Sequence, residues 1–189
     1  MASAGGLLIA AILLVAGLVL SANASFANTY VADQLGEQKI TFPTVDEMSD
    51  EERAVPCLVE NAGQPLTTGK QAECYANNFI GLHLQGIAGG KTYAELGDVQ
   101  SELRAQIAEA QRTNADNLAD LQAELQTVTQ QRETVFKGET LRGLLLTSYG
   151  FSELGAKAGL AATVAYIGAG LMLLLSVLGF WHAARTPAT

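Results

Sequence analysis

The stretch 158–181 is the feature that most limits what this chain can fold into. It carries no charged side chain between Lys157 and His182 and is apolar on every side. At about 1.5 Å per residue, a helix of this length crosses a hydrocarbon core of about 30 Å. Trp181 stands at its end, where interfacial aromatic residues are found. The sequence therefore predicts a transmembrane helix over 158–181 and a short tail over 182–189.

A second uncharged stretch lies near the other end of the chain. It is also apolar all round, and it predicts a transmembrane helix over 1–22. A cleavable signal peptide is the alternative, because Ala22-Asn23-Ala24 fits the small-x-small cleavage pattern. The positively charged segment that opens a signal peptide is missing, which favours a retained span, although cleavage of residues 1–24 stays open. Two spans place both ends of the chain on the same side of a membrane.

The charges lie almost entirely between these two stretches. All nineteen acidic residues and ten of the eleven Lys and Arg residues fall between Asp33 and Lys157, and the whole chain carries a net charge of −8. Such an acidic segment is repelled by nucleic acid and by anionic lipid headgroups. We therefore expect no nucleic-acid partner, and the lipid bilayer is the expected partner of the two apolar stretches.

Cys57 and Cys74 are the only cysteines, and both lie between the predicted spans. An even pair in a small domain suggests a disulfide formed in an oxidising compartment, worth about 3 kcal/mol for a loop of this length. Two free thiols in a cytosolic loop are the alternative. The disulfide favours a plasma-membrane protein with the loop outside and both termini cytoplasmic. The segment 23–95 is thus predicted to be an extracytoplasmic disulfide-bonded domain.

A helical stripe of apolar residues runs through 96–137, which contains no proline. Thr92 and Glu95 precede it with the spacing of a capping box. We predict a continuous coiled-coil-like helical stalk over 96–137, which packs on one partner helix from a second copy or from another protein. The packing positions are Leu96, Leu103, Ile107, Leu118, Leu121, Leu125 and Val128.

The stripe combines two spacings. Leu96, Ile107 and Leu118 recur every eleven residues, whereas later positions recur every seven. An eleven-residue period does not supercoil to the left, so the first half of the stalk is expected to be straight or slightly right-handed. Asn114 and Arg132 interrupt the seam. Polar residues in a seam can set register or partner number, and a helix lying on the surface of its own domain is the alternative.

The segment 138–157, between the stalk and the second span, is apolar but punctuated by charges. It predicts an interfacial helix that is continuous with the span or kinked near Gly150 or Gly155. Within the span, small residues at a four-residue spacing offer a face on which another membrane helix can pack, although small residues are also common in such helices. This face consists of Ala161, Ala165 and Ala169.

Within the disulfide-bonded domain, a helix is predicted to start near Gln71, present a broad apolar face and end at Gly89-Gly90. The helix and its loop could form a pocket for a lipid or another apolar ligand. His83 is the only histidine between the spans, and a hydrogen-bonded structural role fits it better than a ligand role. The acidic residues of 46–53 lack the spacing of a calcium loop, so no metal site is expected there.

A resemblance to a known family rests on four segments between the spans: 38–41, 75–84, 89–96 and 139–151. With the two spans, they are similar to a family of small actinobacterial membrane proteins of uncharacterised function. Members of that family are often labelled aromatic ring-opening dioxygenases. The resemblance implies a two-span membrane protein in which the stalk is an insertion.

The dioxygenase label does not fit the chemistry of this chain. A non-haem iron dioxygenase needs two His and a carboxylate around one metal. The segment between the spans holds His83 alone, and His182 lies beyond the second span. The sequence also lacks a Cys-x-x-Cys-His haem motif, a Gly-x-Ser-x-Gly elbow and a Gly-rich phosphate loop. We therefore expect no catalytic residue, no metal and no cofactor.

Taken together, the sequence predicts a mainly α membrane protein with two transmembrane helices and a small extracytoplasmic domain that contains a long coiled-coil-like helix. The expected function is a non-enzymatic integral membrane scaffold or accessory subunit. It would pack on partner membrane proteins in a complex, or on itself as a homo-oligomer. An extracytoplasmic ligand- or lipid-binding module is the alternative.

Overall fold

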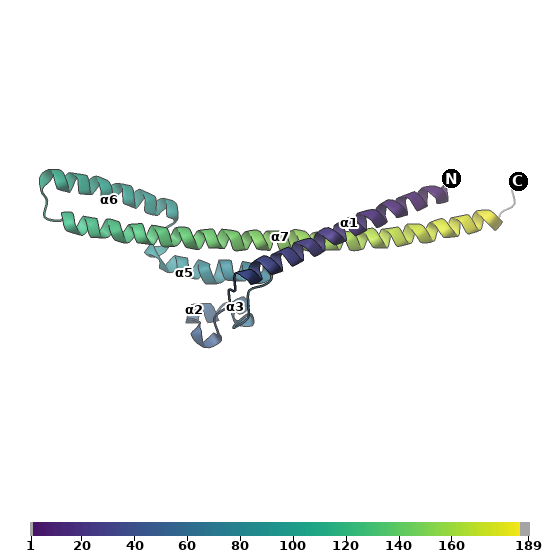
Figure 1. Cartoon of the computed structure of the whole chain (residues 1–189), viewed down its shortest axis with the longest axis horizontal. Coiled ribbons are helices and arrows are strands. Elements are labelled where there is room, and N and C mark those ends of the chain that lie inside the picture. The colour runs from purple at the N-terminus through teal and green to yellow at the C-terminus, as the bar shows by residue number, and fades with distance from the viewer. Residues whose placement is uncertain (1, 186–189) are drawn as a thin grey trace. The chain divides into compact units, whose positions relative to one another are not determined.

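The computed structural model describes residues 2–185, and within them the chain is mainly helical, with an isolated bridge between Thr41 and Pro65 in place of strands. The chain divides into two compact units. The first contains Met1–Gln38, Thr67–Gly69 and Gly150–Thr189, and the second contains Lys39–Leu66 and Lys70–Tyr149. The longest helix, α7 (Leu118–Arg185), contributes to both units (Figure 1).

The first unit is built mainly from a pair of long helices. α1 (Ala2–Glu37) runs alongside the C-terminal part of α7 in the opposite direction (Figure 1). Both helices are longer than the predicted spans. The predicted helix over 138–157 is continuous with the second apolar stretch, which is one of the two expected alternatives, because α7 passes through Gly150 and Gly155 without interruption. A helix tolerates single glycines, and α7 contains no proline to break it.

Small side chains let α1 and α7 approach each other closely. The buried residues recur every seven positions: Ala10, Gly17, Ala24 and Val31 on α1, and Gly155, Ala162, Ala169 and Ser176 on α7. A seven-residue repeat keeps the same face of each helix toward its partner. A Cβ on Gly17 would lie 2.7 Å from the ring of Tyr166, and one on Gly155 would lie 2.8 Å from the Cβ of Ala27. Glycine at these positions therefore permits the contact.

The second unit opens with short helical turns around a small core. These turns are η1 (Val45–Glu47), α2 (Asp50–Arg53) and α3 (Pro56–Glu60). The core contains Phe42, Leu58 and Leu66, all fully buried. Ser49 caps α2, because its hydroxyl accepts the backbone N–H of Glu52 while the Glu52 carboxylate accepts the backbone N–H of Ser49. Local capping thus stabilises turns that are too short to persist alone.

A helical rod follows these turns. It consists of α4 (Gly69–Cys74), the π-helical segment η2 (Tyr75–Ile80) and α5 (Gly81–Gly86), and it is closed by the turn η3 (Ala88–Gly90). Leu84 of the rod packs over Gly138 of α7, where a Cβ would lie 2.6 Å from Leu84 Cδ2. Arg142 Nε donates to the carbonyl of Ala76 at 3.1 Å. The rod thus packs along α7 through the apolar contact of Leu84 and the hydrogen bonding of Arg142.

The predicted stalk is two helices instead of one. α6 (Tyr93–Thr113) ends at Asn114, which adopts the left-handed conformation with φ 53° and ψ 45°, and α7 begins at Leu118. The N–H of Ala115 reaches back to the carbonyl of Ala110 at 2.9 Å, the bond that closes a helix end of this kind. The chain therefore reverses, and α6 lies beside the first part of α7 as an antiparallel hairpin (Figure 1).

This reversal removes the eleven-residue period expected for the first half of the stalk. Ile107 and Leu118 lie on different helices, so the spacing between them belongs to no single element. Within each helix, buried apolar residues instead recur every seven positions: Leu96, Leu103 and Ala110 on α6, and Val128 and Val135 on α7. The physical cause is Asn114, because asparagine is one of the few residues besides glycine that readily adopts the left-handed conformation.

Candidate functional site

The small-residue face predicted on the second span lies against the chain's own first helix. Ala165 and Ala169 are buried in the first unit, and Ala162 completes their face, whereas Ala161 is exposed. The adjacent Gly168 faces Leu13 of α1, since a Cβ there would lie 3.2 Å from Leu13 Cδ1. The surface on which a foreign membrane helix was expected to pack is therefore used within the chain.

The outward faces of the same two helices carry large apolar side chains. The exposed residues include Leu8, Ile12, Val15, Leu18 and Val19 on α1, and Leu160, Val164, Ile167, Leu171, Leu174 and Leu175 on α7. Both helices are long and apolar enough to cross a membrane. Soluble proteins rarely expose a continuous apolar surface of this extent to water.

The packing positions predicted on the stalk divide into two groups in the hairpin. Leu96, Leu103 and Val128 are buried between α6 and α7. Ile107, Leu118, Leu121 and Leu125 are only half-buried. A pair of helices covers the centre of an apolar stripe and leaves its edges accessible. The hairpin therefore supplies the partner helix for the centre of its own seam.

A polar clasp joins the two helices of the hairpin. Gln100, 3% exposed, donates to Thr129 Oγ1 at 2.7 Å and accepts a hydrogen bond from Arg132 Nη1 at 2.7 Å. Arg132 Nε donates to the carbonyl of Tyr93 at 3.1 Å, and the guanidinium lies 4.0 Å from the centre of the Tyr93 ring. Gly97 leaves room for it, since a Cβ there would lie 3.0 Å from Arg132 Nη2.

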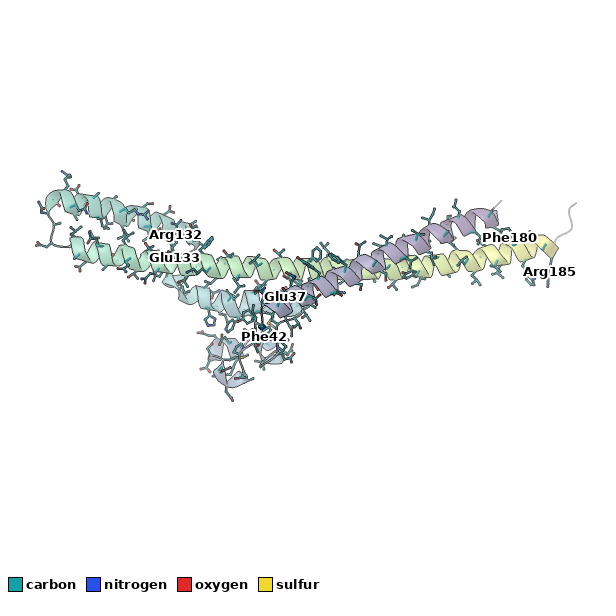
Figure 2. All side chains as sticks on the ribbon, in the orientation of Figure 1. Glu37, Phe42, Arg132, Glu133, Phe180 and Arg185 are labelled. Atoms are coloured by element: carbon teal, nitrogen blue, oxygen red, sulfur yellow. A yellow bond between two sulfur atoms is a disulfide. The ribbon has the colours of Figure 1, made fainter. Side chains whose placement is uncertain are left out.

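The clasp is open to solvent on one side. Figure 2 labels Arg132 and Glu133 on α7 where α6 runs beside it. A groove of about 300 Å³ lies here, and it is lined by Tyr93, Gln100, Arg104, Thr129, Arg132, Glu133 and Phe136. The rings of Tyr93 and Phe136 are exposed and lie 5.6 Å apart. Arginine and exposed aromatic rings are the residue types that dominate protein interfaces.

Cys57 and Cys74 form the predicted disulfide, with their Cα atoms 6.2 Å apart. The bond joins α3 to the end of α4. Asn78, in the π-helical segment, donates its side-chain N–H to Cys57 Sγ at 3.4 Å. Asn61 donates to the carbonyl of Cys57 at 2.8 Å. The disulfide and the Asn78 amide tie the short turns of the second unit to the rod, and the Asn61 amide closes the end of α3.

An aromatic row lies next to the disulfide. The ring centres of Phe42 and Tyr75 are 5.1 Å apart, those of Tyr75 and Phe79 are 4.6 Å apart, and the His83 ring follows 4.5 Å from Phe79. His83 Nδ1 lies 2.8 Å from the carbonyl of Phe79. Glu52 is buried beside this row, and its Oε1 has no hydrogen-bond partner among the described residues. Burial, followed by the charge of Glu52, raises the pKa of Tyr75.

Glu52 Oε1 and His83 Nδ1 are 3.8 Å apart, which is too long for a hydrogen bond. The cluster thus combines one carboxylate, one imidazole and one phenol whose environment favours the protonated form. The geometry is that of a packed core contact between α2 and the rod.

Gln100, Glu52 and the Arg142 contact with Ala76 were not anticipated from the sequence. Gln100 lies four residues after Leu96 and three before Leu103, which is a seam position, but its polarity conceals it in an apolar pattern. Glu52 stands in a run of acidic residues that resembles ordinary solvated surface. The groups that Gln100 and Arg142 contact are distant in sequence, so no local signal identifies these contacts. Glu52 has a local signal for its capping role, the three-residue spacing from Ser49, but none for its burial.

Arg142 reaches the rod at its π-helical segment. The Ala76 carbonyl accepts two hydrogen bonds, one from the N–H of Gly81 in the wide π-type pattern and one from Arg142 Nε.

Within residues 2–185, no group of three or more His, Cys, Asp and Glu side chains is placed to hold a metal ion. The chain was compared with protein-family models, curated proteins and solved structures, and none of them matches it.

Proposed function

We propose that this chain is a non-enzymatic integral membrane scaffold or accessory subunit. One observation carries the proposal: α1 and α7 pair through small residues in the first unit while their outward faces stay apolar. A bilayer is the solvent in which such a surface is stable, and helices satisfy their own backbone hydrogen bonds there. Close packing through Gly, Ala and Ser is also the usual way in which membrane helices associate.

The coiled-coil-like hairpin of α6 and α7 is the part that we propose contacts a partner. Its groove presents Tyr93, Phe136 and two arginines, and several of its seam residues are only half-buried. The partner is another membrane protein of a complex or a second copy of the chain. A polar clasp supports this role because it fixes the hairpin's register before a partner binds, which lowers the entropic cost of association.

We place the protein in the plasma membrane with the segment between the spans outside and both termini cytoplasmic. The disulfide between Cys57 and Cys74 supports this orientation, because disulfides persist in oxidising compartments.

The alternative, a lipid-binding module, would use the apolar face of the rod. On that face the ring of Tyr75 contacts both Phe79 and the buried Phe42, which precedes the rod in sequence. These side chains are occupied by internal packing, which favours the scaffold.

The proposal is tested by crosslinking in native membranes, mild-detergent extraction and native mass spectrometry of the intact chain. We expect a complex of defined stoichiometry, either with a second membrane protein or with further copies. A lone monomer carrying bound lipid would overturn the scaffold and support the binding module.

Orientation is tested on intact cells with a membrane-impermeant maleimide, applied with and without a reductant. We expect Cys57 and Cys74 to be labelled only after reduction, because they are joined in a disulfide on the outer side. If the cysteines are labelled only after the cells are lysed, the segment between the spans lies in the cytoplasm and the proposed orientation is wrong. The proposal that the two helices span a membrane would not be affected.

A further inference from the structure

We propose that Phe26, Tyr30 and Phe151 form an aromatic collar that lies in the lipid–water interface of the bilayer. The collar belongs to the first unit, with two residues on α1 and one on α7. Its partner is the headgroup and glycerol layer of a membrane. This inference rests on the proposed membrane function and deepens it, because it states where along the helix pair the membrane ends.

The three rings are in mutual contact and are nevertheless exposed. Phe26 and Tyr30 stack with their centres 5.7 Å apart, and Phe151 meets them edge-on at 6.4 Å and 5.9 Å. Their exposed fractions are 60%, 48% and 38%. A core cluster would be buried, whereas rings with an apolar body and, in tyrosine, a polar tip are favoured at the membrane interface.

The collar lies next to the change in charge on α1, and on α7 it lies just before the last two charges that precede the uncharged run. α1 carries no charged residue before Asp33, which follows shortly after Tyr30. On α7, Glu153 and Lys157 are the last charges before the uncharged run, and Lys157 is exposed. A lysine at this depth can extend its amine toward the headgroups while its aliphatic part remains in the apolar layer.

A second aromatic group stands at the opposite end of the same pair. Phe180 and Trp181 are exposed, and the Arg185 guanidinium lies 3.9 Å from the centre of the Trp181 ring. Figure 2 labels Phe180 and Arg185 at that end of α7. Phe151 and Trp181 are about 45 Å apart along the helix at about 1.5 Å per residue. A bilayer with its headgroup regions is about 40–45 Å thick, so the two aromatic groups fit its two interfaces.

This assignment moves the membrane boundary outward from the spans 1–22 and 158–181 predicted from sequence. Residues 23–30 then lie in the interface instead of in water, and residues 151–157 are the part of the predicted interfacial segment 138–157 that lies between the collar and the span. Asn23 is compatible with this depth, because its side-chain N–H donates to the carbonyl of Val19 at 2.9 Å. The helix pair is continuous through this layer, and the contact of Gly155 with Ala27 lies within it.

The test measures tryptophan depth in phosphatidylcholine vesicles that contain the full-length protein. Trp181 is the only native tryptophan, so W181F provides a background for single reporters placed along α1. The reporters are Leu18→Trp, Tyr30→Trp and Glu37→Trp, all at exposed positions of one helix. Fluorescence is quenched in separate samples by lipids labelled near the glycerol, by lipids labelled near the chain end, and by aqueous iodide. Circular dichroism confirms that each variant is folded.

We expect Tyr30→Trp to be quenched about twofold more by the shallow lipid label than by the deep one, as an interfacial aromatic should be. Leu18→Trp should show the reverse order, and Glu37→Trp should respond mainly to iodide. The native Trp181 should behave like Tyr30→Trp. Phe151→Trp in the same background provides a second reporter of the collar from the other helix.

Three results would overturn the collar. Tyr30→Trp quenched mainly by iodide would place the collar in water. Mainly deep quenching would place it inside the hydrocarbon. Protection from all three quenchers would mean that a protein surface, such as a second copy, covers it. In each case deep quenching of Leu18→Trp would leave the membrane proposal standing, whereas loss of lipid quenching at Leu18→Trp would overturn the membrane proposal itself.

Discussion

Arg132 Nη1 donates a hydrogen bond of 2.7 Å to Oε1 of Gln100, and this contact fixes the register of α6 against α7. The same guanidinium donates a hydrogen bond from Nε to the Tyr93 carbonyl and lies over the Tyr93 ring. Apolar contacts alone allow one helix to shift along the other. A buried amide such as that of Gln100 is stable only in the register that brings its hydrogen-bond partners within reach. Arg132, one of the two polar residues that interrupt the apolar stripe, therefore favours a single alignment of α6 against α7.

Replacing Arg132 with Gln should destabilise the hairpin by about 1–3 kcal/mol, because it leaves the buried Gln100 Oε1 without its donor. Hydrogen exchange of the α6 amides in the full-length protein measures the effect as loss of protection. Arg104→Gln is the matched control, since Arg104 is exposed on α6 and takes no part in the clasp. Equal loss of protection in both variants would show that charge, and not the clasp, stabilises the hairpin.

The features predicted from the sequence were those with local signals. The uncharged runs at the two ends became two helices long and apolar enough to cross a membrane. The cysteine pair became a disulfide. Thr92 and Glu95 formed a capping box at the start of α6. Each of these depends on hydropathy, on cysteine number or on residues three positions apart, so a single stretch of sequence contains the information.

The features that were missed depend on distant partners or on one backbone angle. The stripe of the stalk continues across Asn114, where neither glycine nor proline marks a turn, so the reversal left no strong signal. Ala161 follows the four-residue spacing of Ala165 and Ala169, but the face turned toward α1 follows a seven-residue repeat and contains Ala162 instead. Which face of a helix is buried is decided by the second helix.

Asn114 provides a second prediction, because its φ of 53° is costly for most residues with a side chain. Asn114→Ala should destabilise the hairpin by about 1 kcal/mol, whereas Asn114→Gly should be neutral or slightly stabilising. Urea denaturation followed by circular dichroism measures both variants against the parent. Equal destabilisation by alanine and glycine would indicate that the Asn114 side chain, and not its backbone conformation, closes the turn.

The capping box at the start of α6 predicts a pH dependence. The backbone N–H of Thr92, and then its hydroxyl, donate to the Glu95 carboxylate and lower the pKa of Glu95 below its ordinary value of 4.5. A lowered folded-state pKa means that the stabilisation is present above the unfolded value and is lost as pH falls through the folded value. α6 should therefore lose amide protection on acidification below about pH 4.5.

The variant Glu95→Gln isolates this effect, because glutamine can cap the helix but does not titrate. Its α6 protection should change less between about pH 6 and pH 3 than that of the parent. Asp98→Asn removes a carboxylate on the same helix that is exposed and forms no cap. An equal change of pH response in both variants would assign the dependence to general charge and not to the cap.

The disulfide predicts a loss of stability on reduction. Replacing both cysteines in Cys57→Ser/Cys74→Ser should lower the unfolding free energy by about 3 kcal/mol for a loop of this length. Chemical denaturation under non-reducing conditions measures the difference from the parent. Under a strong reductant, the parent and the double variant should become similar. A large difference that persists after reduction would mean that the serines disturb the packing of α3 or the rod.

Gly17 provides the sharpest test of the helix pair in the first unit. Its missing Cβ leaves room for the ring of Tyr166, so Gly17→Leu should separate α1 from α7 at a cost of about 1–3 kcal/mol from overpacking. Gly5→Leu is the matched control, because nothing lies within 4 Å of a Cβ at that position. Both substitutions add the same apolar side chain to the same helix, so a difference between them reports on packing and not on hydropathy.

The readout is an engineered crosslink at the end of the pair. A Cβ on Gly179 would lie 3.6 Å from the Cβ of Ser3, which suits a disulfide between Ser3→Cys and Gly179→Cys. In membranes treated with a mild oxidant, the crosslink should form readily in the parent and in Gly5→Leu, and several-fold less in Gly17→Leu. Equal yields in all three would show that the helices do not pair through the face that contains Gly17.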